Sequence, residues 1–374
     1  MSDIDDPRVW SAAAPSSQAA ELHALAAASL GAATALDSDR HDAKIVRRLR
    51  ALLDAEDGGA LAALFDAAPG AAVYRHLWRL LTRAEGASDG DALRATVFAL
   101  PVVVVAALAD GAVPQTAPSL PGVLPEAGAL AALLRKHGAL AGNRTFALGN
   151  ALVDAEALGF ARLPRLLARR ALDAGAPTPL DLAPAPIVLA AGHESVHLRF
   201  IVGVAVAAPG VDLLADESTQ GWGIPLTQAL GAQVAVPGTT VLALPHAPQR
   251  LVTAVQTGRA LQREVSAQVF AGNALRKFRA SVGEPSAVIS AHRVAGVPTG
   301  GELRLSLSSP FEPRDAEGFR CPLYAADRTA DVVQMLTTLL ADCRVGDVRV
   351  LPGVHADRDP ATDVPLLFKA DALH

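Results

Sequence analysis

The motif with the clearest chemical meaning in this sequence is HESVH at residues 193–197, which matches the pattern H-E-x-x-H. On a helix, two histidines four residues apart lie on one face and can bind zinc, and the glutamate between them can act as a general base. The motif therefore raises one chemical hypothesis, a zinc-dependent hydrolase in which His193 and His197 bind the metal and Glu194 is the catalytic residue.

A third ligand for this hypothetical site is Glu217, which follows His197 by 20 residues. This separation resembles that of the third ligand in thermolysin-like metallopeptidases. Under this alternative the cofactor is zinc and the metal ligands are His193, His197 and Glu217. The principal hypothesis developed below has no cofactor.

The sequence around the motif favours a strand over the helix that zinc binding requires. Apolar side chains alternate with a period of two from His197 to Val206, which is typical of a half-buried strand. Ser195 stands where these peptidases carry a bulky apolar residue, and Arg199 stands where a buried residue is usual. We therefore expect residues 193–195 to form a turn between two strands, with histidines that have no metal role.

Other catalytic patterns are weak or missing. GASDG at residues 86–90 matches G-x-S-x-G, but a nucleophile elbow needs a buried strand before it and a helix after it. This copy lies in a polar stretch between Glu85 and Asp91, so we expect a solvated turn. No lysine has a P-loop context, which excludes P-loop nucleotide hydrolysis, and no G-x-G-x-x-G follows a predicted strand.

The 374 residues are 51% hydrophobic and 19% charged, and the formal net charge is −5. A typical domain carries about 25% charged residues. The mild negative charge gives no electrostatic reason to expect nucleic acid, and no apolar run is long enough for a membrane span. A shortage of charge leaves larger apolar patches, which usually mark interfaces. We therefore expect a protein partner or a homo-oligomer.

The two cysteines, Cys321 and Cys343, form no C-x-x-C motif. Free thiols are typical of the reducing cytoplasm. The acidic N-terminus also lacks the basic and apolar regions of a signal peptide. The sequence therefore predicts a cytoplasmic protein.

The N-terminal half predicts mainly helices. Residues 1–17 are expected to be a mobile arm and residues 18–175 a helical domain. Apolar residues recur with a helical period in segments 43–55 and 71–83. Val102–Val105 is β-branched and predicts one buried strand within this domain.

A Pro-rich linker at 176–186 precedes a second domain at 187–374, where strand patterns multiply. From Thr239 onward the expected order is βαββαβ, which is that of the ferredoxin-like fold. Within its long first helix, Gly258 and Gly272 mark where that helix could break. The expected elements are strands at 239–245, 286–294, 302–308 and 347–351, and helices at 249–279 and 327–342.

The sequence thus predicts an α+β fold, in which a helical domain is followed by a mixed α/β domain with a ferredoxin-like core. The connection Ser309–Tyr324 is longer than usual and is a candidate binding loop. Because no coherent catalytic set emerges, the principal hypothesis is a non-catalytic subunit or scaffold of a cytoplasmic multi-protein assembly. The zinc-dependent hydrolase stays open as the alternative.

Overall fold

The structure is a computed structural model with helices and antiparallel sheets, which confirms the mixed α+β class. Among the residues that it describes, none of the helices combines the length and the apolar composition that crossing a membrane requires. The described residues are 16–55, 57–85, 94–108, 119–140, 146–158, 167–168, 170–171, 180–189, 194–207, 214, 221–281, 283–294, 301–309, 316–324, 326–360 and 362–369.

The chain folds into two compact units, each built from segments that are distant in the sequence. The first unit contains residues 1–48, 59–80 and 263–374, and the second contains residues 49–58 and 81–262. Residues 1–15 of the expected arm and 176–179 of the expected linker lie outside the described residues. The domain limits drawn from the sequence therefore stay predictions.

Among the described residues four helices precede the first strand, and two of them contain most of the segments 43–55 and 71–83 that the helical period predicts. The four helices are α2 (Ser17–Leu30), α3 (Ala35–Asp54), α4 (Gly58–Asp66) and α5 (Ala71–Glu85). Ser16 caps α2, because its hydroxyl oxygen accepts a hydrogen bond from the N–H of Ala19 at 3.2 Å. The buried carboxylate of Asp42 accepts hydrogen bonds from Ser29 at 2.6 Å and from His76 at 2.9 Å, which ties α2, α3 and α5 together.

A five-stranded antiparallel sheet is the centre of the second unit. Its strands are β1 (Arg94–Leu108), β3 (Phe146–Val153), β5 (Ser195–Ala207), β6 (Thr239–Pro245) and β7 (Gln249–Arg250). The strand order is β3-β5-β1-β6, and β7 also pairs with β1. The strand expected from His197 to Val206 is confirmed as β5. The strand expected at Val102–Val105 is confirmed within the much longer β1.

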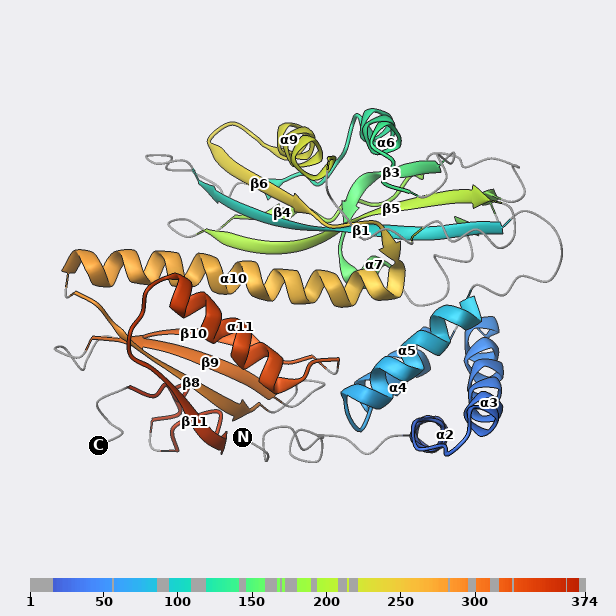
Figure 1. Cartoon of the computed structure of the whole chain (residues 1–374). Helices are drawn as coiled ribbons and strands as arrows, with labels where there is room; N and C mark the ends of the chain where they lie inside the picture. Colours follow the sequence, from blue (N-terminus) through green and yellow to red (C-terminus); the bar gives the residue numbers. More distant parts are fainter. Residues whose placement is uncertain are drawn as a thin grey trace. The chain divides into compact units, whose positions relative to one another are not determined.

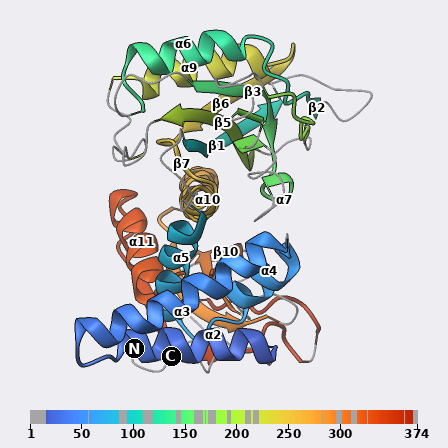
Figure 2. The ribbon, with the colours of Figure 1, turned by 90° about the vertical axis from the view of Figure 1, so that its right-hand side faces the viewer.

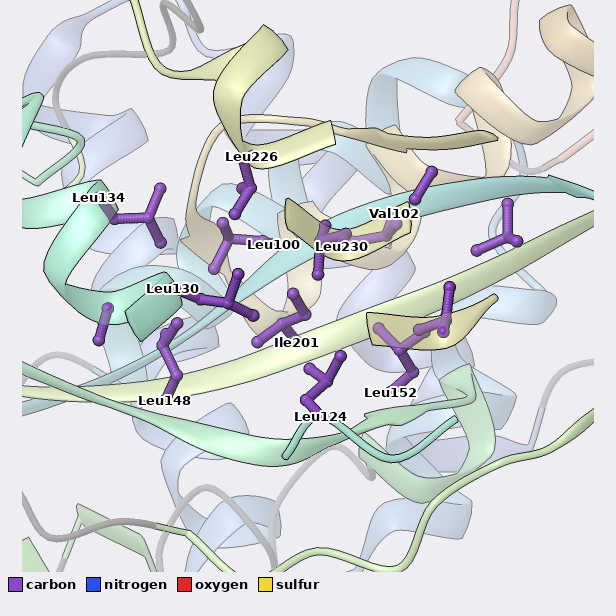
Figure 3. Close-up of a cluster of buried hydrophobic side chains, with 14 of the residues drawn as sticks. Leu100, Val102, Leu124, Leu130, Leu134, Leu148, Leu152, Ile201, Leu226 and Leu230 are labelled. Atoms are coloured by element: carbon purple, nitrogen blue, oxygen red, sulfur yellow. The ribbon is translucent and has the colours of Figure 1, made fainter. Parts of the chain in front are cut away.

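Helices α6 (Ala127–Lys136) and α9 (Gly223–Val234) cover one face of this sheet (Figures 1 and 2). Leu130 of α6 and Leu226 of α9 are buried against Leu100 of β1 and Ile201 of β5 (Figure 3). The short elements of this unit are α7 (Ala155–Leu158) and the paired strands β2 (Ser119–Leu120) and β4 (Ile187–Val188).

The beginning of helix α10 (Leu251–Ser281) lies against the opposite face of the same sheet (Figure 2). A methyl group on Gly258 would stand 2.8 Å from Leu198 and 3.2 Å from Phe200, both in β5. Neither Gly258 nor Gly272 breaks the helix, which is continuous over 31 residues. The close approach of helix and sheet explains why glycine is accommodated at position 258.

A four-stranded sheet lies in the first unit, with the order β10-β9-β8-β11. The strands are β8 (Ser286–Arg293), β9 (Gly301–Ser308), β10 (Ala316–Pro322) and β11 (Val348–His355). Helix α11 (Thr329–Asp342) links β10 to β11, which is parallel to β8. One face carries the apolar core, where Ile289 and Leu305 pack with Phe278 of α10 and Leu336 of α11.

The expected ferredoxin-like core is not confirmed. Strand β6, which the sequence order makes its first strand, pairs with β1 in the five-stranded sheet. The four-stranded sheet therefore does not contain β6, and its fourth strand is β10. Strand β10 lies within the predicted loop Ser309–Tyr324, where pairing with β9 compensates for a weak strand pattern.

Candidate functional site

The HESVH motif does not form a helix over its described residues. Strand β5 begins at Ser195, so His197 belongs to a strand and lies opposite Val104 of β1. Burial lowers the pKa of His197, and the charge of Arg199 lowers it further. The zinc motif needs a helix through both histidines, whereas His197 lies in a strand and His193 lies outside the described residues.

Of the remaining residues of the zinc alternative, the structure describes only Glu194. Glu194 is exposed and directly precedes β5, whereas His193 and Glu217 lie outside the described residues. Within the described part of the chain, no three His, Cys, Asp or Glu side chains are grouped so that they could hold a metal ion. The GASDG segment at 86–90 also lies outside the described part. These sites stay predictions.

A buried polar face lies on the four-stranded sheet, on the side opposite the apolar core. Strands β8 and β9 alternate between apolar residues on one face and polar residues on the other. Each of the polar side chains is buried, and His292, Ser290, Arg304 and Ser306 are 0% exposed. The polar residues are Ser286, Ser290 and His292 on β8, and Glu302, Arg304, Ser306 and Ser308 on β9.

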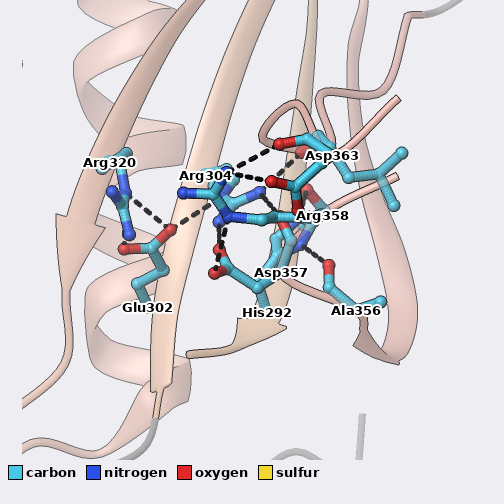
Figure 4. Close-up of polar contacts among 10 residues, drawn as sticks. His292, Glu302, Arg304, Arg320, Ala356, Asp357, Arg358 and Asp363 are labelled. Carbon is cyan, nitrogen blue, oxygen red and sulfur yellow. Dashed lines mark hydrogen bonds and ion pairs between the residues drawn. The ribbon is translucent and has the colours of Figure 1, made fainter. Parts of the chain in front are cut away.

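Ser290 and His292 form a hydrogen-bonded pair on this face. The Ser290 hydroxyl lies 2.8 Å from Nε2 of His292, and Nδ1 of His292 lies 2.7 Å from the carbonyl oxygen of Ala356 (Figure 4). Burial lowers the pKa of His292; the hydrogen bond to Ala356 opposes this, and the nearby charges of Arg304 and His355 lower the pKa further. A serine beside a neutral, oriented histidine has the composition of a nucleophile and its base.

Arg304 binds the chain that follows β11. Its guanidinium donates to the carbonyl oxygens of Asp357 at 2.5 Å and Leu366 at 2.9 Å, and it also forms ion pairs with the carboxylates of Asp357 and Glu302 (Figure 4). Phe368 lies beside His292, with ring centroids 5.9 Å apart. These contacts hold the C-terminal segment, residues 356–369, on the polar face.

The polar face therefore has a clear structural role. Both nitrogens of His292 are engaged, Ser290 is sealed from solvent, and Arg304 binds two carbonyls and two carboxylates of its own chain. The side chains of Arg304 and Glu302 are buried and require such pairing, because an unpaired buried charge is strongly destabilising. In this conformation the groups fix the C-terminal segment, and a substrate has no access to Ser290.

A second candidate site is the surface formed by α9 and β6. Strand β6 pairs with β1 along one side, and no described residue pairs with its other side. Two large apolar side chains are exposed on these elements: Ile224 of α9 is 75% exposed, and Leu242 of β6, which points to the face of the sheet opposite α9, is 47% exposed. We call α9 and β6 together the α9–β6 surface.

Charge is missing from the whole α9–β6 surface. Between Glu217 and Arg250 the sequence contains no Asp, Glu, Lys or Arg. With 19% charged residues in the chain, about six would be expected in a stretch of this length. Part of the stretch is exposed, so burial does not account for the lack of charge. Depletion of charged residues is characteristic of the core of protein–protein interfaces.

Over the described residues, the edge strands β3, β10 and β11 are covered or protected. At the outer edge of β3, the N–H of Leu152 donates to Gly122 at 2.7 Å and the N–H of Asn150 donates to Leu180 at 3.1 Å. Strand β10 carries Glu317 and Arg320, and β11 contains Pro352 within an irregular register. Charges, prolines and irregularities are the usual protection of an edge strand against pairing. Strand β6 has no charge and no irregularity in its register, and its one proline is its last residue, Pro245.

Comparison with known proteins identifies no relative: no family model, no curated protein and no solved structure matches this chain.

Both sites had signals in the sequence that motif searching passes over. The polar face is visible as a strict alternation in ELRLSLS at residues 302–308, where every second residue is polar. The α9–β6 surface is visible as the charge-free stretch between Glu217 and Arg250. Neither signal is a catalytic motif. The first is an alternation of polar and apolar residues, and the second is a lack of charged residues.

Proposed function

We propose that this protein is a non-catalytic subunit of a multi-protein assembly and that it binds a protein partner through the α9–β6 surface. The observation that carries the proposal is that β6 is an unprotected edge strand within a charge-free stretch. An exposed edge offers a row of backbone hydrogen-bonding groups, which a partner strand can pair with. Leu242 and Ile224 add apolar area on either side of this edge.

The buried polar face supports the same proposal indirectly. Its serine, histidine and arginine side chains, which could serve catalysis elsewhere, bind the C-terminal segment in this fold. These polar side chains are thus engaged in holding the C-terminal segment in place. The edge of β6, which no described residue pairs, is an exposed feature that a partner strand can bind.

A photo-crosslinking side chain at position 242 tests the proposal. We expect protein–protein adducts when the group replaces Leu242, because the partner strand would lie against it. The matched control is Val188, which is 62% exposed and lies on β4, a strand that pairs with β2 and not with β6. The partner found in the adduct should bind the purified wild-type chain and lose binding to Leu242→Lys. Equal adducts from both positions, or none from position 242, would contradict the proposal.

We further propose that the assembly is cytoplasmic. Cys321 and Cys343 are free thiols, and burial raises the pKa of Cys321 to about 12. An unpaired buried thiol is compatible with a reducing compartment. Fractionation of source cells, followed by detection of the native chain, tests this location; recovery outside the cytoplasmic fraction would contradict it.

A further inference from the structure

We infer that the partner of the α9–β6 surface is a second copy of this chain, joined by antiparallel pairing of β6 with β6 around a two-fold axis at Leu242. This inference rests on the proposed function and names its partner. The direction of the free backbone groups, the side chains that would meet and the charge of the surface all favour this pairing.

The hydrogen bonds to β1 determine which backbone groups of β6 are free. The N–H of His246 donates to the carbonyl oxygen of Pro101 at 2.8 Å. Bonding pairs alternate along an antiparallel ladder, so Thr240, Leu242 and Leu244 also turn their backbone groups toward β1. Val241 and Ala243 consequently turn their N–H and C=O groups toward the open edge.

These two free residues fit a symmetric pairing. With a two-fold axis at Leu242, Val241 of one copy lies opposite Ala243 of the other, and both pairs can exchange N–H···O=C hydrogen bonds. The ladder then ends on each side. Pro245 has no N–H to donate, and the N–H of Thr239 already donates to Val236 at 3.1 Å. The pairing is therefore short and closed, as a two-fold dimer requires.

The side chains at the axis are compatible with themselves. Val241 and Ala243 pack in the core beneath α9, so Leu242 points to the other face of the sheet. In the dimer the two Leu242 residues form a non-hydrogen-bonded pair, in which side chains approach most closely. Each Leu242 side chain, which is 47% exposed in the single chain, would be covered in part by its counterpart.

The charge of the surface favours a second copy over a different kind of partner. A charged partner would gain nothing from a surface without Asp, Glu, Lys or Arg between Glu217 and Arg250. Because α9 and β6 carry no Asp, Glu, Lys or Arg, these two elements of a second copy bring no like charge against this surface. Association should accordingly depend little on salt.

Sedimentation of the full chain over a range of concentrations tests the inference. We expect a reversible dimer whose dissociation constant is nearly the same at low and high salt. Leu242→Lys places two ammonium groups face to face and should weaken the dimer at least about 100-fold. Val188→Lys, an equally drastic change at an exposed apolar residue outside β6, should leave the dimer unchanged.

A disulfide trap tests the position of the axis. In a Cys343→Ser background, Leu242→Cys should form a covalent dimer on oxidation, because Cα atoms of such a pair lie about 4.5 Å apart, within reach of a disulfide. Val188→Cys should stay monomeric under the same conditions. Circular dichroism of each variant confirms that it is folded before association is measured.

The failures of the two proposals differ. A wild-type chain that stays monomeric at all concentrations, or a dimer that Leu242→Lys does not weaken, overturns the second copy as partner. If a different protein is then crosslinked at position 242, the proposed function stands with another partner. If position 242 yields no adduct at all, both proposals fall.

Discussion

Glu302 lies directly opposite His292 in the β8–β9 register, but the Glu302 carboxylate accepts hydrogen bonds from Arg304 at 2.6 Å and Arg320 at 2.9 Å. His292 is instead held between a hydroxyl and a carbonyl. A carbonyl oxygen can only accept, so Nδ1 of His292 carries the hydrogen toward Ala356, and Nε2 accepts the hydroxyl hydrogen of Ser290. The neutral form of His292 is thus the form that fits this site.

Acid should loosen the C-terminal segment. Folding lowers the pKa of His292 from its ordinary value of 6.5, so below that pH the unfolded chain binds the proton more strongly. The stability that neutral His292 provides is present above pH 6.5 and is lost as the pH falls through the lower folded-state pKa. Hydrogen exchange of residues 356–369 between about pH 8 and pH 5 should show faster opening in acid.

The variant His292→Asn keeps a side-chain donor for Ala356 and cannot titrate. Its exchange rates, corrected for the intrinsic effect of pH, should depend less on pH than those of the wild type. His137→Asn, at an exposed position in the second unit, serves as the control. An unchanged pH dependence in His292→Asn would show that other groups are responsible, such as His23 and His197, whose pKa values are also lowered by burial.

Arg304 and Arg320 share the carboxylate of Glu302 but should differ greatly in importance. The Arg304 side chain is 0% exposed and the Arg320 side chain is 54% exposed. Arg304→Met removes the buried donor to the carbonyl oxygens of Asp357 and Leu366 and leaves Glu302 with Arg320 alone, so it should lower the free energy of unfolding by about 3–5 kcal/mol. Arg320→Ala removes an exposed pair and should cost about 0–1 kcal/mol. Urea denaturation compares the two; similar losses would contradict the role of Arg304.

Two glycines of helix α10 should respond to alanine in opposite directions. A methyl group at Gly272 meets nothing within 4 Å, so Gly272→Ala should stabilise the protein by about 0.5–1 kcal/mol through helix propensity. At Gly258 the same methyl group stands 2.8 Å from Leu198 and 3.2 Å from the buried ring of Phe200. Gly258→Ala should therefore destabilise by about 1 kcal/mol or more. Thermal unfolding of both variants measures the sign of each change in stability. Stabilisation at both positions would contradict the close packing of α10 against β5 at Gly258.

The purified protein should contain no stoichiometric zinc. Ser195–His197 lies in strand β5, where the side chains do not take the helical spacing that the zinc motif needs. Elemental analysis of protein prepared without chelators makes the measurement, and His193→Ala should not change the metal content. About one zinc per chain, lost in His193→Ala, would restore the hydrolase alternative.

The sequence predicts the strands whose side chains alternate and the helices whose apolar residues recur, because both periods record local burial. Strand β5 and helix α11 are examples. It fails at β10, where Gly318, Arg320 and Pro322 give no strand pattern and pairing with β9 decides the conformation. It also fails for β6, because nothing in its seven residues specifies which of the two sheets it joins.

The polar face and the α9–β6 surface were harder to predict than the elements that carry them. Ser290, His292 and Arg304 are brought together by the β8–β9 register and by a segment that folds back after β11. The HESVH motif is defined by residue spacing alone, and spacing does not reveal that a strand begins at Ser195. Edge strands cannot be identified until the order of strands in a sheet is known.

The lack of charge around β6 also determines how the chain can be cut. Trypsin cleaves after lysine and arginine, and the sequence contains neither between Arg199 and Arg250. Complete digestion therefore leaves all of α9 and β6, with most of β5, in one large apolar peptide from Phe200 to Arg250. Amine-reactive crosslinkers likewise have no lysine to modify there. A peptide map based on trypsin would cover the rest of the chain and miss the edge strand, whereas chymotrypsin or pepsin, which cleave at apolar residues, would report on it.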